Sequence, residues 1–335
     1  MMQNCAKLAL QRCKKCIDMN LGSKMRLLAH FNYIDVVAKT GSIRKAADRL
    51  NITSTALNRR ILALEDELGT PIFERLPQGV RLNVAGELMI QHIRHSMADL
   101  SRVTSQIADL SGVRRGHVNI ACTAEIVGGF MPSRIAAYRN DHSGVTFDIS
   151  KQTPTSALRA LSDLAADLSV IFGPIPPAEF QILATVQLDA HIVVAEAHPL
   201  ASRENVRFVD IQQFPTVVPA EGSGLSDLLM SAQTRSGLAL NKAISTDSFE
   251  FMANYHGFED TVSFALPLHE MGPASGSGAR SRALPFVYVP LHPTDRMTGL
   301  LHLVQAKGRV LPVAAAKFAE ELVQYFNEKF PADTN

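Results

Sequence analysis

Apolar residues between positions 27 and 68 recur every three or four residues, in three runs separated by polar breaks. This spacing places side chains on one face of a helix, so each run predicts an amphipathic helix. Ser42 and Thr53 stand where the second and third helices would begin, and their hydroxyls can cap free N–H groups. Gly69 ends the third run, as glycine commonly does after a helix. The apolar positions are Leu27, Leu28, Phe31, Ile34, Val37 and Ala38, then Ile43, Ala46, Ala47 and Leu50, then Leu57, Ile61, Leu64 and Leu68.

The second and third predicted helices are joined by the short turn Asn51-Ile52, which is typical of a helix-turn-helix unit. Six Lys/Arg and one Asp lie between positions 39 and 60. Cationic and hydrogen-bonding side chains at the start of a helix suit a DNA major groove lined by phosphates. A solvated helix surface is the alternative explanation. The side chains that point outward from the first turns of the third helix are Ser54, Thr55, Asn58 and Arg59.

Two strand-like pieces, residues 71–76 and 80–82, surround Pro77-Gln78-Gly79 and predict a β-hairpin beside the helices. Such a wing can lay Arg75 and Arg81 along the DNA backbone. The acidic residues 65–67 at the far end of the third helix would point away from DNA. The side chains predicted to contact DNA are therefore Ser42, Arg44, Thr53, Ser54, Thr55, Asn58, Arg59, Arg60, Arg75 and Arg81.

Asn83 is placed to cap a long helix that runs to about Ser111, roughly 40 Å at 1.5 Å per residue. A helix with a narrow apolar stripe needs a partner. The spacing of the stripe favours pairing with the same helix of a second subunit over packing on its own domain. The stripe consists of Ile93, Leu100 and Ile107, seven residues apart, with Met89, Val103 and Leu110 near the companion seam.

From His117 onward short strand-like runs alternate with helical runs, which predicts a parallel α/β sheet. The pattern divides this region into two lobes. The first is expected to comprise residues 117–188 and 285–330, and the second residues 189–284. The strand-like runs 286–289 and 300–305 are expected to return the chain to the first lobe.

Chain length and charge indicate separate domains with different roles. A chain of 335 residues is too long for one ordinary core, so two or three domains are expected. Residues 1–116 carry 18 Lys/Arg and 10 Asp/Glu, a net charge of +8, whereas the rest carries 15 and 22, a net charge of −7. A basic front and an acidic back indicate a polyanion-binding module joined to a module of another kind. No run of about 18 apolar residues occurs, so the expected location is the cytoplasm, with no membrane contact.

Three of the four cysteines lie in the first 16 residues. The spacing Cys13-x-x-Cys16 can bind a metal or form a redox pair, but a zinc site needs four ligands and no second pair follows. Residues 1–24 are therefore interpreted as a disordered N-terminal extension, and no metal or cofactor is expected. A thiol sensor built on Cys13 and Cys16 is an open alternative.

Four segments of the basic half follow one another at fixed spacing. They are Gly41-Ser42-x-x-x-Ala46-Ala47-x-x-Leu50, Leu57-x-Arg59-x-Ile61-x-x-Leu64-Glu65-x-x-Leu68-Gly69, Phe73-x-Arg75 and Ala85-Gly86. In order and spacing they resemble the DNA-binding half of LysR-type transcriptional regulators. The sequence departs from the family at Thr55, Asn58 and Asn83, where Pro, Ser and Thr are usual. Thr55 and Asn58 are at base-facing positions, so we expect a different operator sequence.

The resemblance implies a three-part organisation. It implies a winged helix-turn-helix domain over residues 25–83, a linker and dimerisation helix over 84–112, and an effector-binding domain over 117–330 that is similar to periplasmic solute-binding proteins. The implied partners are double-stranded DNA with dyad-related half-sites, a small polar effector, RNA polymerase, and further copies of the chain in a homodimer or homotetramer.

Candidate effector ligands come from strand ends. Ligands of open α/β sheets bind beyond the carboxyl ends of strands, near helix N-termini. Thr123 follows the first predicted strand and Thr153 the second, and Ser223 and Asp247 are the matching candidates in the other lobe. The resemblance also implies hydroxyl ligands at such places. Each hydroxyl considered alone is more typical of a helix cap.

Catalytic motifs are missing from the sequence. No nucleophile elbow, P-loop, dinucleotide fingerprint or H-E-x-x-H motif occurs, so an enzyme is not expected. The prediction is a sequence-specific DNA-binding regulator that responds to an effector. Its rival is a small-solute sensor with only weak, non-specific DNA binding.

Overall fold

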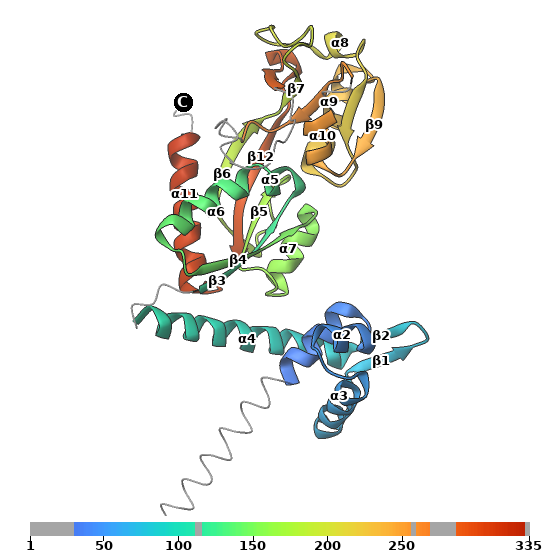
Figure 1. The fold of residues 1–335 in the computed structure, drawn as a ribbon, viewed down its shortest axis with the longest axis vertical. Coiled ribbons are helices and arrows are strands. Elements are labelled where there is room, and N and C mark those ends of the chain that lie inside the picture. The colour runs from blue at the N-terminus through green and yellow to red at the C-terminus, as the bar shows by residue number, and fades with distance from the viewer. Residues whose placement is uncertain (1–29, 111–115, 256–258, 269–285, 332–335) are drawn as a thin grey trace, which may run out of the picture. The chain divides into compact units, whose positions relative to one another are not determined.

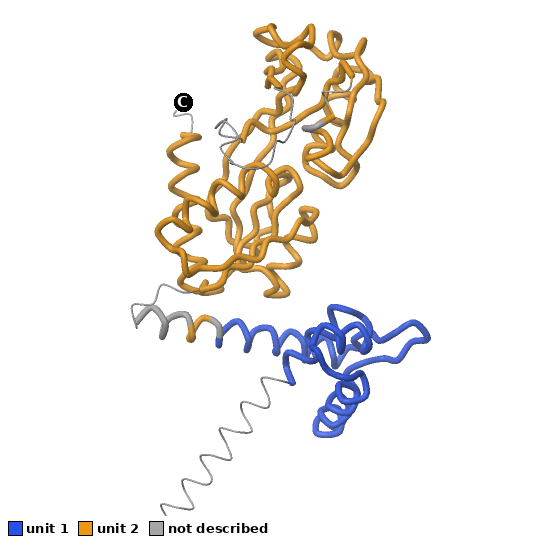
Figure 2. Tube along the Cα trace, viewed as in Figure 1, with its two compact units in different colours: residues 1–101 blue, residues 102–335 orange. Residues whose placement is uncertain are grey.

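The structure, a computed structural model, describes residues 30–110, 116–255, 259–268 and 286–331. The chain divides into two compact units (Figure 2): unit 1 is residues 1–101 and unit 2 is residues 102–335. The predicted extension of residues 1–24, with Cys13 and Cys16, lies outside the described residues. Within those residues, no helix combines the length and apolar character that a membrane span requires.

Unit 1 consists of helices and one hairpin that begin where the sequence offers caps. Its elements are a helix over residues 30–40, α2 (Ile43–Arg49), α3 (Ser54–Leu68), β1 (Phe73–Leu76), β2 (Gly79–Leu82) and α4 (Val84–Leu110) (Figure 1). The capping hydrogen bonds run from Lys45 N to Ser42 Oγ, from Ala56 N to Thr53 Oγ1 and from Gly86 N to Asn83 Oδ1. Gly69 ends α3 in the left-handed conformation, with φ of 66°. The predicted winged helix-turn-helix and the long helix after it are confirmed.

The core of unit 1 lies between these helices. Ala46 and Ala47 are buried, and their small side chains let α2 pack closely on α3. Ile93 of α4 is fully buried in the same core, and Met89 packs against it. The predicted place of Ile93 in an intersubunit seam is therefore wrong, because this part of α4 closes the core of its own unit. The side chains of Ile107 and Leu110 lie outside the described ones.

Lobe 1 of unit 2 is a five-stranded sheet covered by helices on both faces. Val118, Ile120 and Cys122 face a core shared with α6 and α11, whereas Ala121 faces α7. The strand order is β4 (Val145–Lys151), β3 (Gly116–Cys122), β5 (Leu168–Phe172), β12 (Thr298–Ala306) and β6 (Phe180–Asp189). The helices are α5 (Ala124–Val127), α6 (Phe130–Asp141), α7 (Pro154–Ser162) and α11 (Val313–Lys329).

The sheet of lobe 1 is mixed, which corrects the predicted all-parallel sheet. Strands β4, β3 and β5 are parallel, but β12 runs antiparallel to both β5 and β6. The returning chain enters the sheet from the opposite end after passing through lobe 2, and this reverses the direction of β12.

Lobe 2 contains two small sheets. One has the order β10 (Ser263–Ala265), β7 (His191–Ala195), β11 (Phe286–Pro290), and the other pairs β8 (Thr216–Pro219) with β9 (Lys242–Thr246). Its helices are α8 (Phe208–Ile211), α9 (Gly224–Ser236) and α10 (Phe249–Tyr255). The prediction that residues 286–289 return to lobe 1 is wrong, because β11 pairs with β7 of lobe 2. Residues 300–305 do return, as part of β12.

Candidate functional site

The outward face of α3 carries the side chains predicted to meet DNA bases. Ser54, Thr55 and Arg59 are exposed, while Leu57 and Ile61 are buried on the opposite face. Within the described residues, no hydrogen bond or ion pair holds the Arg59 guanidinium. The first turns of α3 therefore present polar groups, one of them a free cation, to a partner.

The hairpin is connected to this face through Asn58. Arg75 Nη2 donates a hydrogen bond to Asn58 Oδ1 at 2.9 Å, which joins β1 to α3. Arg81 Nε lies 2.7 Å from Glu74 Oε2 across the hairpin, and its side chain remains 67% exposed. Both guanidiniums stay at the surface, where a phosphate backbone can reach them.

Arg60 is placed differently from the other predicted DNA contacts. It is half-buried, its Nη1 donates to the Tyr33 hydroxyl, and its guanidinium carbon lies 4.9 Å from the centre of the Tyr33 ring. The structure thus joins Arg60 to the first helix. Arg44 is exposed on α2, and Ser42 and Thr53 cap α2 and α3.

Glu65 has a contact that its sequence position did not suggest. Its Oε1 accepts hydrogen bonds from Ile72 N at 2.8 Å and from Phe73 N at 3.1 Å. A carboxylate that receives two backbone N–H groups makes strong, charge-assisted hydrogen bonds. Glu65 therefore holds the start of the hairpin against the end of α3.

Replacing Glu65 with alanine is expected to destabilise unit 1 by about 1–2 kcal/mol, because two backbone N–H groups lose their acceptor. Hydrogen exchange of the Ile72 and Phe73 amides should accelerate. Glu67→Ala, an exposed position two residues further on, serves as the control and should leave both rates unchanged. Equal exchange in the two variants would contradict the role given to Glu65.

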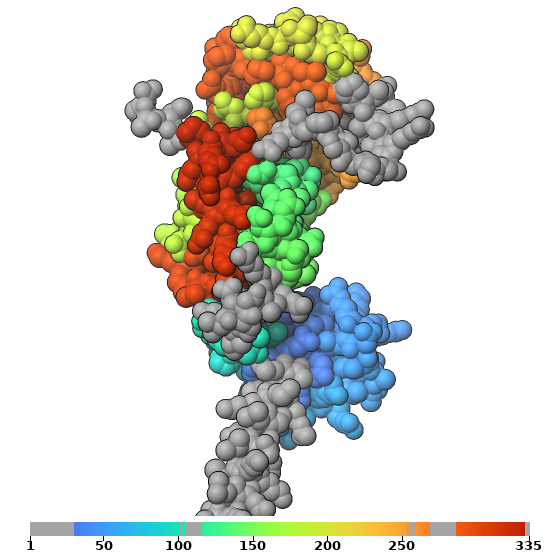
Figure 3. Space-filling view, turned by 60° about the vertical axis from the view of Figure 1, so that its left-hand side comes forward, coloured from blue at the N-terminus to red at the C-terminus, as the bar shows by residue number. Residues whose placement is uncertain are grey.

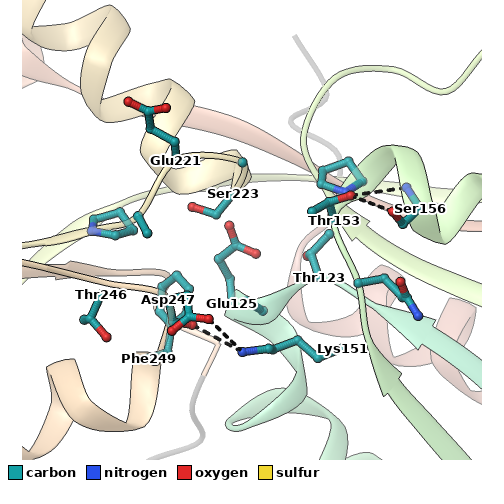
Figure 4. Close-up of a pocket in the computed structure, with 16 residues that line it drawn as sticks. Thr123, Glu125, Lys151, Thr153, Ser156, Glu221, Ser223, Thr246, Asp247 and Phe249 are labelled. Atoms are coloured by element: carbon teal, nitrogen blue, oxygen red, sulfur yellow. Dashed lines mark hydrogen bonds and ion pairs between the residues drawn. The ribbon is translucent and has the colours of Figure 1, made fainter. Parts of the chain in front are cut away.

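A cavity of about 330 Å³ lies between the two lobes of unit 2 (Figure 4). All four predicted effector ligands line it: Thr123, Thr153, Ser223 and Asp247. Thr123 follows β3 and Thr153 follows β4, and these parallel strands end at the same edge of the sheet. The structure therefore brings the four residues together around one space of a size that suits a small molecule.

The hydroxyls of the three predicted ligands Thr123, Thr153 and Ser223 already make hydrogen bonds within the protein. Thr153 and Ser223 cap α7 and α9, and Thr123 is only 1% exposed. The hydrogen bonds run from Phe172 N to Thr123 Oγ1 at 3.1 Å, from Ser156 N to Thr153 Oγ1 at 3.3 Å and from Ser226 N to Ser223 Oγ at 3.1 Å. The bonds from backbone N–H groups use only the lone pairs of each hydroxyl. Thr153 already donates its proton to Ser156 Oγ at 3.0 Å.

Asp247 and Lys151 face each other at the mouth of the cavity. Lys151 Nζ lies 3.8 Å from Asp247 Oδ2, and the two side chains are 53% and 86% exposed. Figure 4 shows this contact between the end of β4 and the start of α10. An ion pair so exposed to water contributes little stability, at most about 1 kcal/mol.

Glu125 is the functional candidate that sequence reasoning missed. It belongs to α5, lines the cavity, and is only 9% exposed. Burial raises the pKa of its carboxyl, an effect that the N–H of Leu225 partly offsets by donating to Oε1 at 3.0 Å. The available signal was an acid in a mostly apolar run shortly after a strand, since Ala124 precedes it and Ile126 and Val127 follow it.

The described residues offer no metal or thiol chemistry. No group of three or more His, Cys, Asp or Glu among them could hold a metal ion. Cys122 is a buried free thiol, and burial raises its pKa to about 12. The thiolate form that reacts as a nucleophile is therefore scarce at neutral pH.

Comparison with known proteins identifies relatives of both units. The DNA-binding family model "Bacterial regulatory helix-turn-helix protein, lysR family" matches residues 28–87, and the model "LysR substrate binding domain" matches residues 111–327. The RuBisCO operon transcriptional regulator of Allochromatium vinosum is 30% identical over 199 residues, which are 59% of this chain and 65% of that protein. That match thus spans a little under two thirds of the relative. The transcriptional dual regulator GltC of Bacillus subtilis is 23% identical over 303 residues, 90% of this chain and 98% of that protein.

Solved structures share the fold along most of the chain. Full-length CbnR in complex with its target DNA has a TM-score of 0.59 at 17% identity, over 89% of this chain and 99% of that chain. The effector-binding domain of QuiR in complex with shikimate has a TM-score of 0.50 at 15% identity, over 64% of this chain and 99% of that chain. Since the substrate-domain model alone spans more than half of the sequence, this chain belongs to the LysR family of transcriptional regulators, with an N-terminal helix-turn-helix domain and a C-terminal effector-binding domain.

Proposed function

We propose that the chain binds operator DNA in a sequence-specific manner and that a small polar effector in unit 2 controls this binding or promoter activation. The observation that carries the proposal is the exposed start of α3, where Ser54, Thr55 and Arg59 face solvent beside a cationic hairpin. Two such helices in a symmetric assembly would read dyad-related half-sites about 34 Å apart, or a multiple of this distance.

The assembly is proposed to be a homodimer or homotetramer. Among the described side chains of α4, four large apolar ones are exposed: Val84 by 78%, Leu88 by 67%, Leu100 by 46% and Val103 by 41%. Covering them with the same helix of a second copy would remove this apolar surface from water. We also propose RNA polymerase as a partner of the assembly. The proposed location is the cytoplasm. No catalysed reaction is assigned to the protein.

Replacing Arg59 with alanine is expected to cost about 1–3 kcal/mol in binding to a cognate operator and little on a scrambled duplex, if the residue reads a base edge. Arg81→Ala should instead weaken binding to both duplexes by one common factor. Arg81 lies exposed on the hairpin, where it can contact phosphates, and phosphate contacts do not depend on the base sequence. Gel-shift titrations of both variants on both duplexes, at one salt concentration, give the four affinities.

Identical behaviour of the two variants would refute the assignment of α3 as the recognition helix. Genomic footprinting provides an independent readout. Discrete inverted-repeat sites support a regulator, and diffuse, salt-sensitive coverage supports a solute sensor with weak, non-specific DNA binding.

A further inference from the structure

Glu125 separates two cavities of unit 2. On one side is the 330 Å³ cavity lined by hydroxyls, and on the other is a cavity of about 460 Å³ with mostly apolar walls that include Val193 and Phe264. Glu125 lines both. A carboxyl group in this position can influence binding in either space.

One oxygen of Glu125 is satisfied and the other is not. Oε1 accepts the hydrogen bond from Leu225 N, so the carboxylate occupies the N-terminus of α9. Figure 4 shows the side chain reaching from α5 toward this end of α9. Oε2 is buried and makes no hydrogen bond of normal geometry among the described residues, although the Thr123 hydroxyl and the Gly224 N–H lie near enough to the carboxyl to lower its pKa. An unpartnered buried oxygen of an acidic group is costly, and a ligand that donates to it recovers that cost.

The charges around Glu125 favour a cationic ligand. The first cavity is lined by Glu125, Glu221 and Asp247, and by a single cation among the described lining residues, Lys151. Lys151 is already drawn to Asp247, through the carboxylate at 3.8 Å and the backbone oxygen at 3.5 Å. The second cavity adds Glu250, and its described lining contains no cation. An anionic ligand would therefore meet mainly like charges, and the anion position at the start of α9 is taken by the protein's own carboxylate.

We propose that the effector of this protein carries an amine group, which in its protonated form donates an N–H hydrogen bond to Glu125 Oε2 from the cavity between the lobes. This inference rests on the proposed function, namely that unit 2 binds an effector. Oε2 is covered in the structure. The carboxylate must therefore turn about its last torsion, which is soft, or the lobes must part. The hydroxyls of Thr123, Thr153 and Ser223 then surround the rest of the ligand.

The proton balance of binding follows from this contact. Burial raises the pKa of the Glu125 carboxyl in the free protein, whereas a bound ammonium group favours the ionised form and lowers it again. Binding below the raised pKa releases a proton, so amine affinity should rise with pH until the free carboxyl is ionised. The other titratable groups that line the two cavities are Lys151 on β4, Glu221 before α9, Asp247 before α10, Glu250 on α10 and Tyr288 on β11.

The test uses full-length protein and matched small probes. Straight-chain compounds of four to six carbons are compared as diamines, diols and dicarboxylates, together with the corresponding monoamines, by thermal shift and then by calorimetric titration. At least one amine should raise the Tm, and the diol and dicarboxylate of the same length should not. Glu125→Gln should weaken its binding at least about thirtyfold and abolish the pH dependence, since one partner of a buried charge pair is removed. Glu221→Gln, an exposed carboxylate of the same cavity, is the control and should weaken binding only a few fold.

Several outcomes overturn the proposal. It fails if no amine stabilises the wild-type protein, if dicarboxylates stabilise it and amines do not, or if Glu125→Gln binds the amine as tightly as the wild type does. Circular dichroism and operator binding of Glu125→Gln verify that the variant folds, and Glu125→Asp, which keeps the charge, should retain part of the affinity. Stabilisation by dicarboxylates alone would refute the amine proposal but not the proposed function, since the protein would still bind an effector. The gel shifts on Arg59→Ala test DNA binding separately, without any effector.

Discussion

Replacing Asp167 with alanine is expected to lower the free energy of unfolding of unit 2 by about 3–5 kcal/mol, because the partly buried Arg309 loses its carboxylate partner and Asn119 loses its acceptor. Asp167 is 3% exposed, and its Oδ1 lies 2.6 Å from Arg309 Nη2. Its Oδ2 accepts hydrogen bonds from Asn119 N at 2.8 Å and from the Asn119 side chain at 3.1 Å. One carboxylate thus holds β3, β5 and the segment before α11 together.

Native-state hydrogen exchange of the β3 and β5 amides measures this loss locally, so unfolding of unit 1 does not obscure it. Asp167→Asn keeps an acceptor for Asn119 and should lose less. Arg159→Ala breaks an exposed ion pair with Asp163, at 3.8 Å and 83% exposure of Arg159, and should cost at most about 1 kcal/mol. A loss no larger for Asp167→Ala than for Arg159→Ala would contradict the role given to the buried pair.

Replacing Gly224 with alanine is expected to disrupt the contact between the lobes, at a cost of about 3 kcal/mol. A Cβ atom there would lie 2.3 Å from the backbone oxygen of Phe172 and 2.8 Å from its Cδ1. The oxygen belongs to β5 and cannot yield without disturbing the sheet, so the start of α9 must move. The hydrogen bond from Leu225 N to Glu125 should then break, and binding in the cavity should weaken.

Gly128→Ala is the matched control for this substitution. A Cβ at Gly128 would meet nothing within 4 Å, and the residue already has helical backbone angles, with φ of −82° and ψ of −32°. Urea unfolding and exchange of the Leu225 amide should separate the two variants. If Gly224→Ala were as stable as Gly128→Ala, the close approach of α9 to β5 would not matter for the fold.

Local signals in the sequence predicted unit 1 well. The caps Ser42, Thr53 and Asn83 and the terminating Gly69 act within three or four residues of their own positions, and the structure confirms each one. The alternation of strands and helices likewise predicted the α/β class of unit 2. Such signals depend on the spacing of apolar residues and on backbone groups a few residues away. Both can be recognised from the sequence alone.

Long-range partners explain what sequence reasoning missed. Glu125 is buried by a helix whose first turn lies 100 residues further on, and Arg60 is held by Tyr33, 27 residues earlier. The composition of β11 is that of an ordinary apolar strand. Its pairing with β7 of lobe 2 could therefore not be predicted from that composition. The four effector candidates were found because they stand at strand ends or helix starts, where local sequence does carry information.

The position of β12 between β5 and β6 has a consequence for how the chain is made. A ribosome must add residues through Ala306 before these two strands can share one sheet. Until then the edges of β5 and β6 that β12 will cover are unpaired, and unpaired edges can bind other nascent chains. The described elements up to the end of α4, by contrast, are complete once residue 110 has emerged. Translation therefore completes the described elements of the N-terminal part well before unit 2 acquires β12, the strand that joins β5 to β6.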